Sequence, residues 1–148
     1  MVPSLNPHKN GIVGFDTMKD ANAKSRLIAA EPQLFVASIE ASCEFYTRKL
    51  GFSVAFTYGD PPFYGQVVRD GARLNLRQLD ELPFRPELQG QLLSATITLE
   101  DAEPLFHEFE VAGVSFHQTL KTEPWGARTF IVADPDGNLI LFAGRSDS

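Results

Sequence analysis

Three polar residues able to hold a charged ligand alternate along one strand-like segment. The segment 72–78 has a polar residue at every second position: Arg73, Asn75 and Arg77. Apolar residues precede and separate them, and a glutamine ends the segment. Successive side chains of a strand point to opposite faces, so if the apolar residues pack beneath a helix, the polar ones face a cavity. The fixed fork of an arginine side chain favours carboxylate or phosphate ligands. The alternative is that both arginines pair with carboxylates such as Glu31 or reach solvent.

Two further segments add residues to the same predicted cavity face. If the apolar residues of the segment 92–99 point to a helix, Ser94 and Thr96 face the cavity. Phe35 joins them from the segment 33–39. Such residues favour non-covalent binding, although Ser94 and Thr96 are also consistent with a purely structural role in a strand.

The chain offers little for covalent chemistry. Its one cysteine, Cys43, lies on a predicted helix without a histidine signature nearby and is interpreted as an inert thiol. Asp134 and Asp136 are interpreted as turn formers rather than a general acid–base pair. A glycine-rich phosphate loop, a G-x-S-x-G elbow and an H-E-x-x-H motif are absent from the sequence.

Composition indicates a globular protein with an acidic balance. The 148 residues carry 13 Lys+Arg against 19 Asp+Glu, a formal net charge of −6, and 43% are hydrophobic. An acidic chain argues against nucleic-acid binding, which needs a basic face to neutralise phosphates. No apolar run reaches the ~20 residues that span a bilayer and the N-terminus lacks a secretory signal. A cytoplasmic protein without a nucleic-acid or membrane partner is expected.

The elements that must position these residues occur twice in the same order. A strand, a helix and three strands are predicted at 33–39, 41–50, 53–58, 64–69 and 72–78. The same series is predicted again. A strand at 92–99 is followed by a helix between Asp101 and Gly113, and then by strands at 114–117, 128–133 and 138–142. Asp70-Gly71 and Asp136-Gly137 form equivalent tight turns 66 residues apart.

This order predicts an α+β fold made of two βαβββ modules, at about 32–80 and 91–143. The modules form a curved mixed sheet that buries one face under its helices and lines a central cleft with the other. Residues 32–148 are the expected domain. Residues 1–31 are an N-terminal arm, with a short helix expected over 18–30.

Four motifs resemble the vicinal-oxygen-chelate superfamily. The segment 45–52 (FYTRKLGF) is similar to its FY…LGF signature, and 134–138 (DPDGN) is similar to its turn. Pro124-Trp125-Gly126 is typical of the glyoxalase/bleomycin-resistance branch, and Val67-Val68-Arg69-Asp70 resembles the bleomycin-binding proteins more closely still. The resemblance covers residues 32–143. It implies a homodimer whose subunits share each cleft and exchange their N-terminal strands.

The resemblance also gives a role to two aromatic residues. Similar bleomycin binders stack planar ligand rings on aromatic residues at the positions of Trp125 and Tyr64. Trp125 lies in the loop before the segment 128–133, and Tyr64 begins the segment 64–69. The structural alternatives are that Trp125 closes the end of a sheet by packing alone and that Tyr64 is a surface residue of a hairpin.

The catalytic members of the superfamily hold a divalent metal at four positions, commonly His or Gln, Glu, His and Glu. The matching positions here are Glu31, Asn75, Ser94 and Leu141. They are expected to lie near one another on the concave face. Only Glu31 is a good ligand, and a divalent cation needs at least about three anionic or imidazole donors. Neither a metal nor another cofactor is therefore expected.

The leading hypothesis is metal-independent binding and sequestration of a small aromatic molecule, as in bleomycin resistance. If both Arg73 and Arg77 point inward, an anionic aromatic ligand suits the cleft better than the cationic drug. The alternatives are a glyoxalase-superfamily lyase, isomerase or dioxygenase with an atypical metal site, and a non-catalytic partner subunit with a vestigial cleft.

Overall fold

The computed structural model describes residues 24–83, 86–88 and 90–145. The chain divides into two compact units, residues 1–30 and 31–148. In the first unit, residues 24–30 form neither helix nor strand, and the side chains of Leu27 and Ile28 are almost fully exposed. The helix expected over 18–30 is therefore absent from residues 24–30, and residues 18–23 lie outside the described part. A short helix is marginal in water unless an apolar face packs against something.

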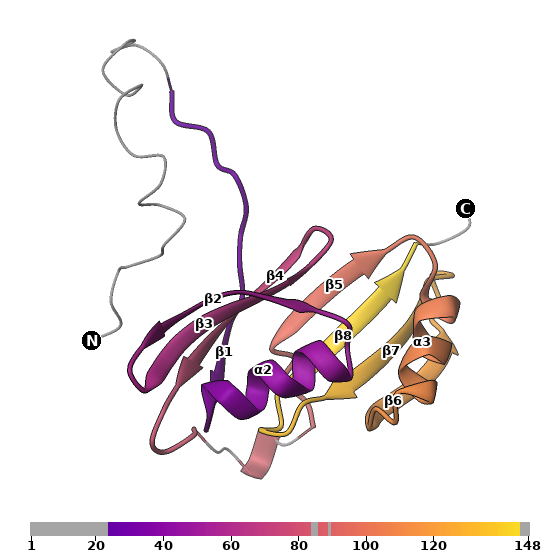
Figure 1. Ribbon diagram of the computed structural model, residues 1–148. Coiled ribbons are helices and arrows are strands. Elements are labelled where there is room, and N and C mark those ends of the chain that lie inside the picture. Colours follow the sequence, from indigo (N-terminus) through magenta and orange to yellow (C-terminus); the bar gives the residue numbers. More distant parts are fainter. Residues whose placement is uncertain (1–23, 84–85, 89, 146–148) are drawn as a thin grey trace. The chain divides into compact units, whose positions relative to one another are not determined.

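The first module of the second unit is a four-stranded mixed sheet with one helix. Its elements are β1 (Gln33–Val36), α2 (Ile39–Arg48), β2 (Ser53–Gly59), β3 (Pro62–Arg69) and β4 (Ala72–Gln78). The strand order is β1-β4-β3-β2, with β1 parallel to β4 and the other pairs antiparallel. Helix α2 lies across one face of this sheet (Figure 1).

The second module repeats this arrangement after a short 3-10 helix, η1 (Pro86–Leu88). Its elements are β5 (Ala95–Leu99), α3 (Ala102–Val111), β6 (Phe116–Thr122), β7 (Arg128–Ala133) and β8 (Leu139–Gly144). The order β5-β8-β7-β6 matches that of the first sheet, and β5 is parallel to β8. The predicted α+β class and the duplicated βαβββ module are confirmed, with a separate four-stranded sheet in each module.

Local sequence signals determine where the helices begin and end. The side chain of Ser38 accepts a hydrogen bond from the backbone N–H of Ala41, and Asp101 accepts one from Glu103 at 3.1 Å. These caps satisfy backbone donors that have no partner within the helix. Gly51 and Gly113 follow the two helices with φ of 73° and 76°, a conformation that favours glycine. The cap at Ser38 starts α2 two residues earlier than the pattern predicts.

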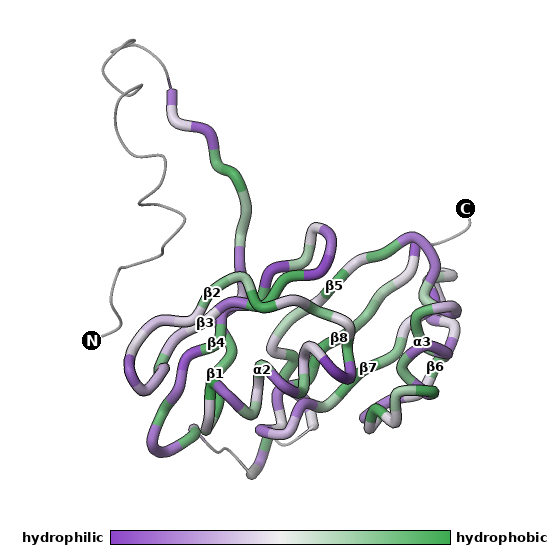
Figure 2. The backbone as a smooth tube through the Cα atoms, viewed as in Figure 1, coloured by the Kyte–Doolittle hydropathy of each residue, from purple (hydrophilic) through white to green (hydrophobic). Residues whose placement is uncertain are grey.

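Each sheet buries the side that faces its helix. In the first sheet, Leu34, Val36, Leu74 and Leu76 are fully buried, as strand alternation predicts. The second core holds five phenylalanines that contact one another: Phe106, Phe109, Phe116, Phe130 and Phe142. Hydrophilic residues gather at the hairpin turns of both sheets (Figure 2). The sequence pattern predicts seven large core residues, and all but the half-buried Phe45 are buried: Phe45, Leu50, Leu74, Leu76, Phe106, Phe109 and Phe142.

Two polar contacts at the helix ends join the modules. Arg69 at the end of β3 donates to both carboxylate oxygens of Glu108 on α3, at 2.7 and 3.0 Å, and this contact lowers the pKa of Glu108. Lys49 donates to the backbone carbonyl of Ala112 at 2.8 Å. A cation at the end of a helix also interacts favourably with the helix dipole.

Among the described residues, no helix is long and apolar enough to cross a membrane.

Candidate functional site

The DPDGN turn between β7 and β8 contacts the edge of β1. Asn138 donates to the backbone carbonyl of Phe35 at 2.9 Å, and Asp136 accepts from the backbone N–H of Ala37 at 3.2 Å. Asn138 also accepts a hydrogen bond from the hydroxyl of Ser94 at 3.1 Å. We call these contacts between residues 35–37 and the turn 134–138 the seam. They bring the two modules together although their residues are about a hundred positions apart.

A pocket of about 710 Å³ opens at the seam. Its polar lining comes from both modules: Gln33, Ser94, His117, Asp136 and Asn138. Its apolar lining includes Phe35, Leu82, Pro83, Leu88, Leu92, Leu93 and Leu139. The structure thus places two predicted site residues, Phe35 and Ser94, in one pocket. An apolar pocket with a few convergent polar groups is the usual form of a small-molecule site.

A buried polar cluster occupies the face of the first sheet that points away from α2. Gln66 donates to Asn75 at 2.8 Å and to Glu31 at 3.2 Å, and Asn75 donates to Glu31 at 3.4 Å. Gln66 and Asn75 are opposite each other in the register of β3 and β4. The oxygen of the Gln66 amide is buried and has no hydrogen-bond partner among the described residues. Asn75, predicted as a cavity residue, therefore belongs to a polar network inside the sheet face.

Two aromatic residues lie beside this cluster on the same face, because Phe56 pairs with Gln66 and Tyr64 is two residues before Gln66 in β3. Their rings are 6.1 Å apart. Near the turn of the same hairpin, the rings of Tyr58 and Phe63 are 5.6 Å apart. The hydroxyl of Tyr64 lies 3.5 Å from the side-chain oxygen of Gln33, so the ring face is connected to the wall of the pocket. Tyr64 is buried within β3, and this burial, assisted by nearby Glu31, raises the pKa of its hydroxyl.

The remaining predicted residues lie outside the pocket lining. Arg73 and Thr96 are exposed, and Arg77 is half-buried, opposite Tyr64 in the strand register. Trp125 is 68% exposed in a tight loop closed by a hydrogen bond from Gly126 to Glu123. The exposed position of Trp125 argues against a role in closing the end of the sheet.

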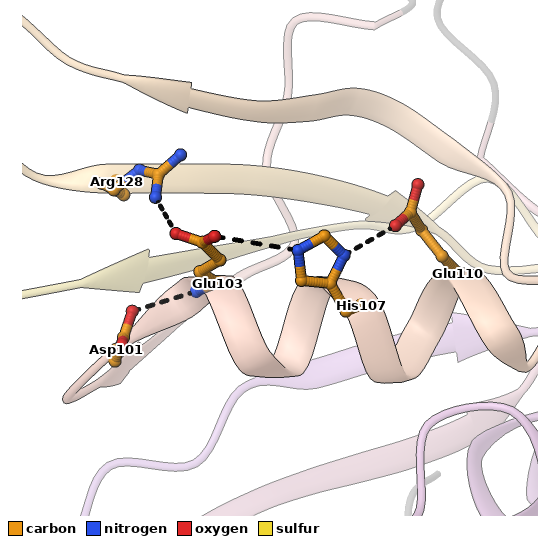
Figure 3. Close-up of polar contacts among 5 residues, drawn as sticks. All are labelled: Asp101, Glu103, His107, Glu110 and Arg128. Atoms are coloured by element: carbon orange, nitrogen blue, oxygen red, sulfur yellow. Dashed lines mark hydrogen bonds and ion pairs between the residues drawn. The ribbon is translucent and has the colours of Figure 1, made fainter.

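Helix α3 carries a separate row of charged residues on its exposed side (Figure 3). Glu103 pairs with Arg128 of β7 and approaches His107, whose other ring nitrogen is 2.9 Å from Glu110. Asp101 caps the same helix. Solvent-exposed pairs of this kind contribute little to stability, and none of these residues lines the pocket. They are interpreted as surface contacts of the helix.

A family model matches most of this chain. The model of the Glyoxalase/Bleomycin resistance protein/Dioxygenase superfamily matches residues 28–142. The chain belongs to this superfamily. The resemblance inferred from the four sequence motifs is thereby confirmed.

Members of the superfamily similar to this chain include bleomycin-related proteins. A bleomycin resistance protein of Geobacillus stearothermophilus is 27% identical over 129 residues, covering 78% of this chain and 96% of that protein. A bleomycin-binding protein of Streptomyces verticillus, solved with copper(II)-bleomycin, matches with a TM-score of 0.65 and 24% identity. The match covers 83% of this chain and 100% of that protein. Another bleomycin-binding protein, solved with bleomycin, matches with a TM-score of 0.66 and 20% identity, covering 81% of this chain and 100% of that protein. At these identities the two structures are evidence for a shared fold alone.

The superfamily's metal positions supply poor ligands in this chain. Glu31, two residues before β1, contacts Asn75 of β4, whereas Ser94 directly precedes β5 and Leu141 lies in β8. One oxygen of the Glu31 carboxylate accepts from the amides of both Gln66 and Asn75, and Leu141 has no donor atom. Among the described residues, no group of three His, Cys, Asp or Glu side chains could hold a metal ion. These residues do not fit a divalent cation.

Several site residues were not found from the sequence. His117 and Asn138 line the pocket, but their contacts there reach distant parts of the sequence: His117 lies near Gly90, and Asn138 bonds to Phe35 and Ser94. Phe56 and Tyr58 reach the face opposite α2 because a bulge between Val54 and Phe56 shifts the register of β2. The aromatic content of the segment 53–58 was a signal for a ring-bearing face, but strand alternation alone does not give its direction.

Proposed function

We propose that this protein binds and sequesters a small molecule with planar rings, of the bleomycin type, without changing it chemically. The observation that carries the proposal is the apolar pocket at the seam, which Phe35 lines and which Gln33 connects to the ring of Tyr64. Aromatic rings bind planar groups by stacking and by edge-to-face contact. The named function of the Geobacillus stearothermophilus relative supports the same ligand class.

The charge of the pocket favours a cationic ligand. Asp136 is the one carboxylate among its described lining residues, and no lysine or arginine is among them. Arg73 and Arg77, the residues that would have favoured an anionic ligand, are outside this lining. The cationic drug is therefore preferred over an anionic metabolite.

The proposal includes independence from metal and other cofactors and a cytoplasmic homodimer. The poor donor set at the superfamily's metal positions supports the first point. The exposure of Trp125 supports the second, because an exposed tryptophan can reach a cleft on a second copy of the chain. Sedimentation equilibrium would detect a dimer, and elemental analysis of protein purified without chelator would detect a bound metal. A stoichiometric divalent metal would contradict this proposal and favour the enzyme alternative.

Calorimetric titration with metal-free bleomycin tests the binding function. We expect saturable heat with a stoichiometry set by the number of clefts. The recovered drug should be chemically unchanged by mass spectrometry. Absence of heat at high micromolar ligand would remove the bleomycin proposal, and a modified drug would show that the protein is an enzyme.

Replacing Trp125 with alanine should weaken ligand binding more than it weakens the fold. Ring stacking contributes about 0.5–1.5 kcal/mol beyond burial, so the affinity should fall roughly 2- to 13-fold. The free energy of unfolding should change by less than about 0.5 kcal/mol, because the side chain is mostly exposed. Calorimetry measures the first quantity and urea denaturation the second.

Wild-type fluorescence gives an independent check, because Trp125 is the chain's only tryptophan. Binding to this residue should change the intensity or wavelength of its emission. A tightly bound ligand that changes neither would show that Trp125 is outside the site, and Tyr64 and Phe35 would then be the rings to substitute.

A further inference from the structure

The amide of Asn138 forms hydrogen bonds with three separate parts of the chain. Its nitrogen donates to the carbonyl of Phe35 and to the carboxylate of Asp134, each at 2.9 Å. Its oxygen accepts from the hydroxyl of Ser94 at 3.1 Å. Phe35 belongs to the first module, whereas Ser94 directly precedes β5 of the second. One side chain thus connects residues of both modules that line the same pocket.

The turn itself depends mainly on Asp134. The carboxylate of Asp134 accepts from the backbone N–H groups of Asp136 and Asn138, at 2.9 and 2.8 Å. The backbone of Asp134 bonds with Gly137 and Asn138. Because these contacts already close the turn, the bonds from Asn138 to Phe35 and Ser94 serve the junction between the modules.

The turn also satisfies backbone groups on the free edge of β1. Among the strands of the described residues, β1 pairs only with β4. On its other side, Asn138 meets the carbonyl of Phe35 and Asp136 meets the N–H of Ala37. Residues two apart in a strand present their backbone groups on the same edge, so these side chains take the place of a neighbouring strand.

We infer that Asn138 is a positioning residue for ligand binding, which holds Phe35 and Ser94 at the spacing that the ligand requires. The inference rests on the proposed function at the seam pocket. It predicts that loss of the Asn138 amide changes the pocket even where the fold is intact.

Two substitutions of Asn138 test this inference by their pH profiles. Asn138→Asp keeps an acceptor for Ser94 but places a carboxylate against the carbonyl of Phe35 and beside Asp134. Its affinity for bleomycin should be about tenfold lower than wild type at neutral pH, the equivalent of one lost hydrogen bond of about 1.4 kcal/mol. Acidification protonates the introduced carboxyl group, restores a donor and should recover affinity relative to wild type. Asn138→Ala should lose affinity without that recovery.

Glu108→Gln is the matched control, because it weakens another contact between the modules. Glu108 pairs with Arg69 and does not line the pocket. The control should lower stability with unchanged affinity. All affinities are measured under conditions where every variant is folded. The inference would be overturned if Glu108→Gln lost as much affinity as the Asn138 variants. It would also be overturned if both Asn138 variants bound bleomycin as tightly as wild type.

Amide hydrogen exchange separates this inference from the proposed function. If wild-type protein fails to bind bleomycin, the proposed function fails, but the seam can still be measured. Asn138→Ala should speed exchange of the Ala37 N–H, which bonds to Asp136 in the seam, at least about tenfold relative to Glu108→Gln. An unchanged rate would show that Asn138 does not hold β1 against the turn, and the positioning role would then be wrong whatever the ligand.

Discussion

Replacing Phe130 with alanine should lower the free energy of unfolding by about 4 kcal/mol, the largest effect expected of a single substitution here. The Phe130 ring is fully buried at the centre of the second core. It stacks on Phe142 with a centroid distance of 5.0 Å and contacts Phe106 edge-on at 5.4 Å. Truncation removes buried apolar surface and leaves a cavity that rigid aromatic neighbours fill poorly. Urea denaturation measures the loss.

Val111→Ala is the control for this prediction. Val111 lies on α3, the helix that covers the same sheet, but its side chain is 90% exposed. Its removal should change stability by less than about 0.5 kcal/mol. If Phe130→Ala costs less than about 1 kcal/mol, the phenylalanine cluster is not the core of the second module.

The sequence predicts the fold well because its signals are local and repeated. Cap residues, glycines after helices and Asp-Gly turns each act over a few residues, and the same series occurs in both modules. Strand β6 is the main difference. The sequence predicts a strand over 114–117, but β6 runs from Phe116 to Thr122. Apart from Leu120, its later residues are polar, and most of them are exposed at the edge of the sheet, so the hydrophobic pattern does not reveal them.

The candidate site is less predictable because its contacts join distant segments. Alternation correctly separates Leu74 and Leu76 from Asn75. It does not show that Asn75 contacts Gln66 and Glu31, since that depends on strand register. The seam requires the relative position of two modules, and the local pattern indicates only that Asp134 and Asp136 form a turn.

The Tyr46–Asp134 pair shows what that turn adds to stability. Both side chains are buried, and the Tyr46 hydroxyl donates to the Asp134 carboxylate at 2.9 Å across the module boundary. The pair also links two of the motifs by which the family was inferred, FYTRKLGF and DPDGN. Burial raises the pKa of Asp134, while hydrogen bonds from Asn138, Tyr46 and the turn oppose that rise.

Tyr46→Phe should therefore cost about 2 kcal/mol at neutral pH, the range for a hydrogen bond to a charged group. The cost should shrink in acid, because a protonated Asp134 is a weaker acceptor. In the wild-type protein, the pKa of Asp134 is higher in the folded than in the unfolded state. Protonation of Asp134 therefore stabilises the fold most at pH values below its unfolded pKa, and this stabilisation is lost as pH rises through the folded pKa. Tyr46→Phe removes a hydrogen bond to the charged carboxylate and raises the folded pKa further, so the stability lost in the variant should grow as pH rises across this range.

A double-mutant cycle with Asp134→Asn separates the pair from its surroundings. The Asp134→Asn background removes the titrating carboxylate, so Tyr46→Phe should cost less there and its cost should not vary with pH across the acid range. Thermal or urea unfolding between acid and neutral pH measures all four proteins. A pH-independent cost in the wild-type background would show that Asp134 does not titrate while bonded to Tyr46. An equal cost in both backgrounds would show that the hydroxyl acts through packing in α2 and not through the link between the two modules.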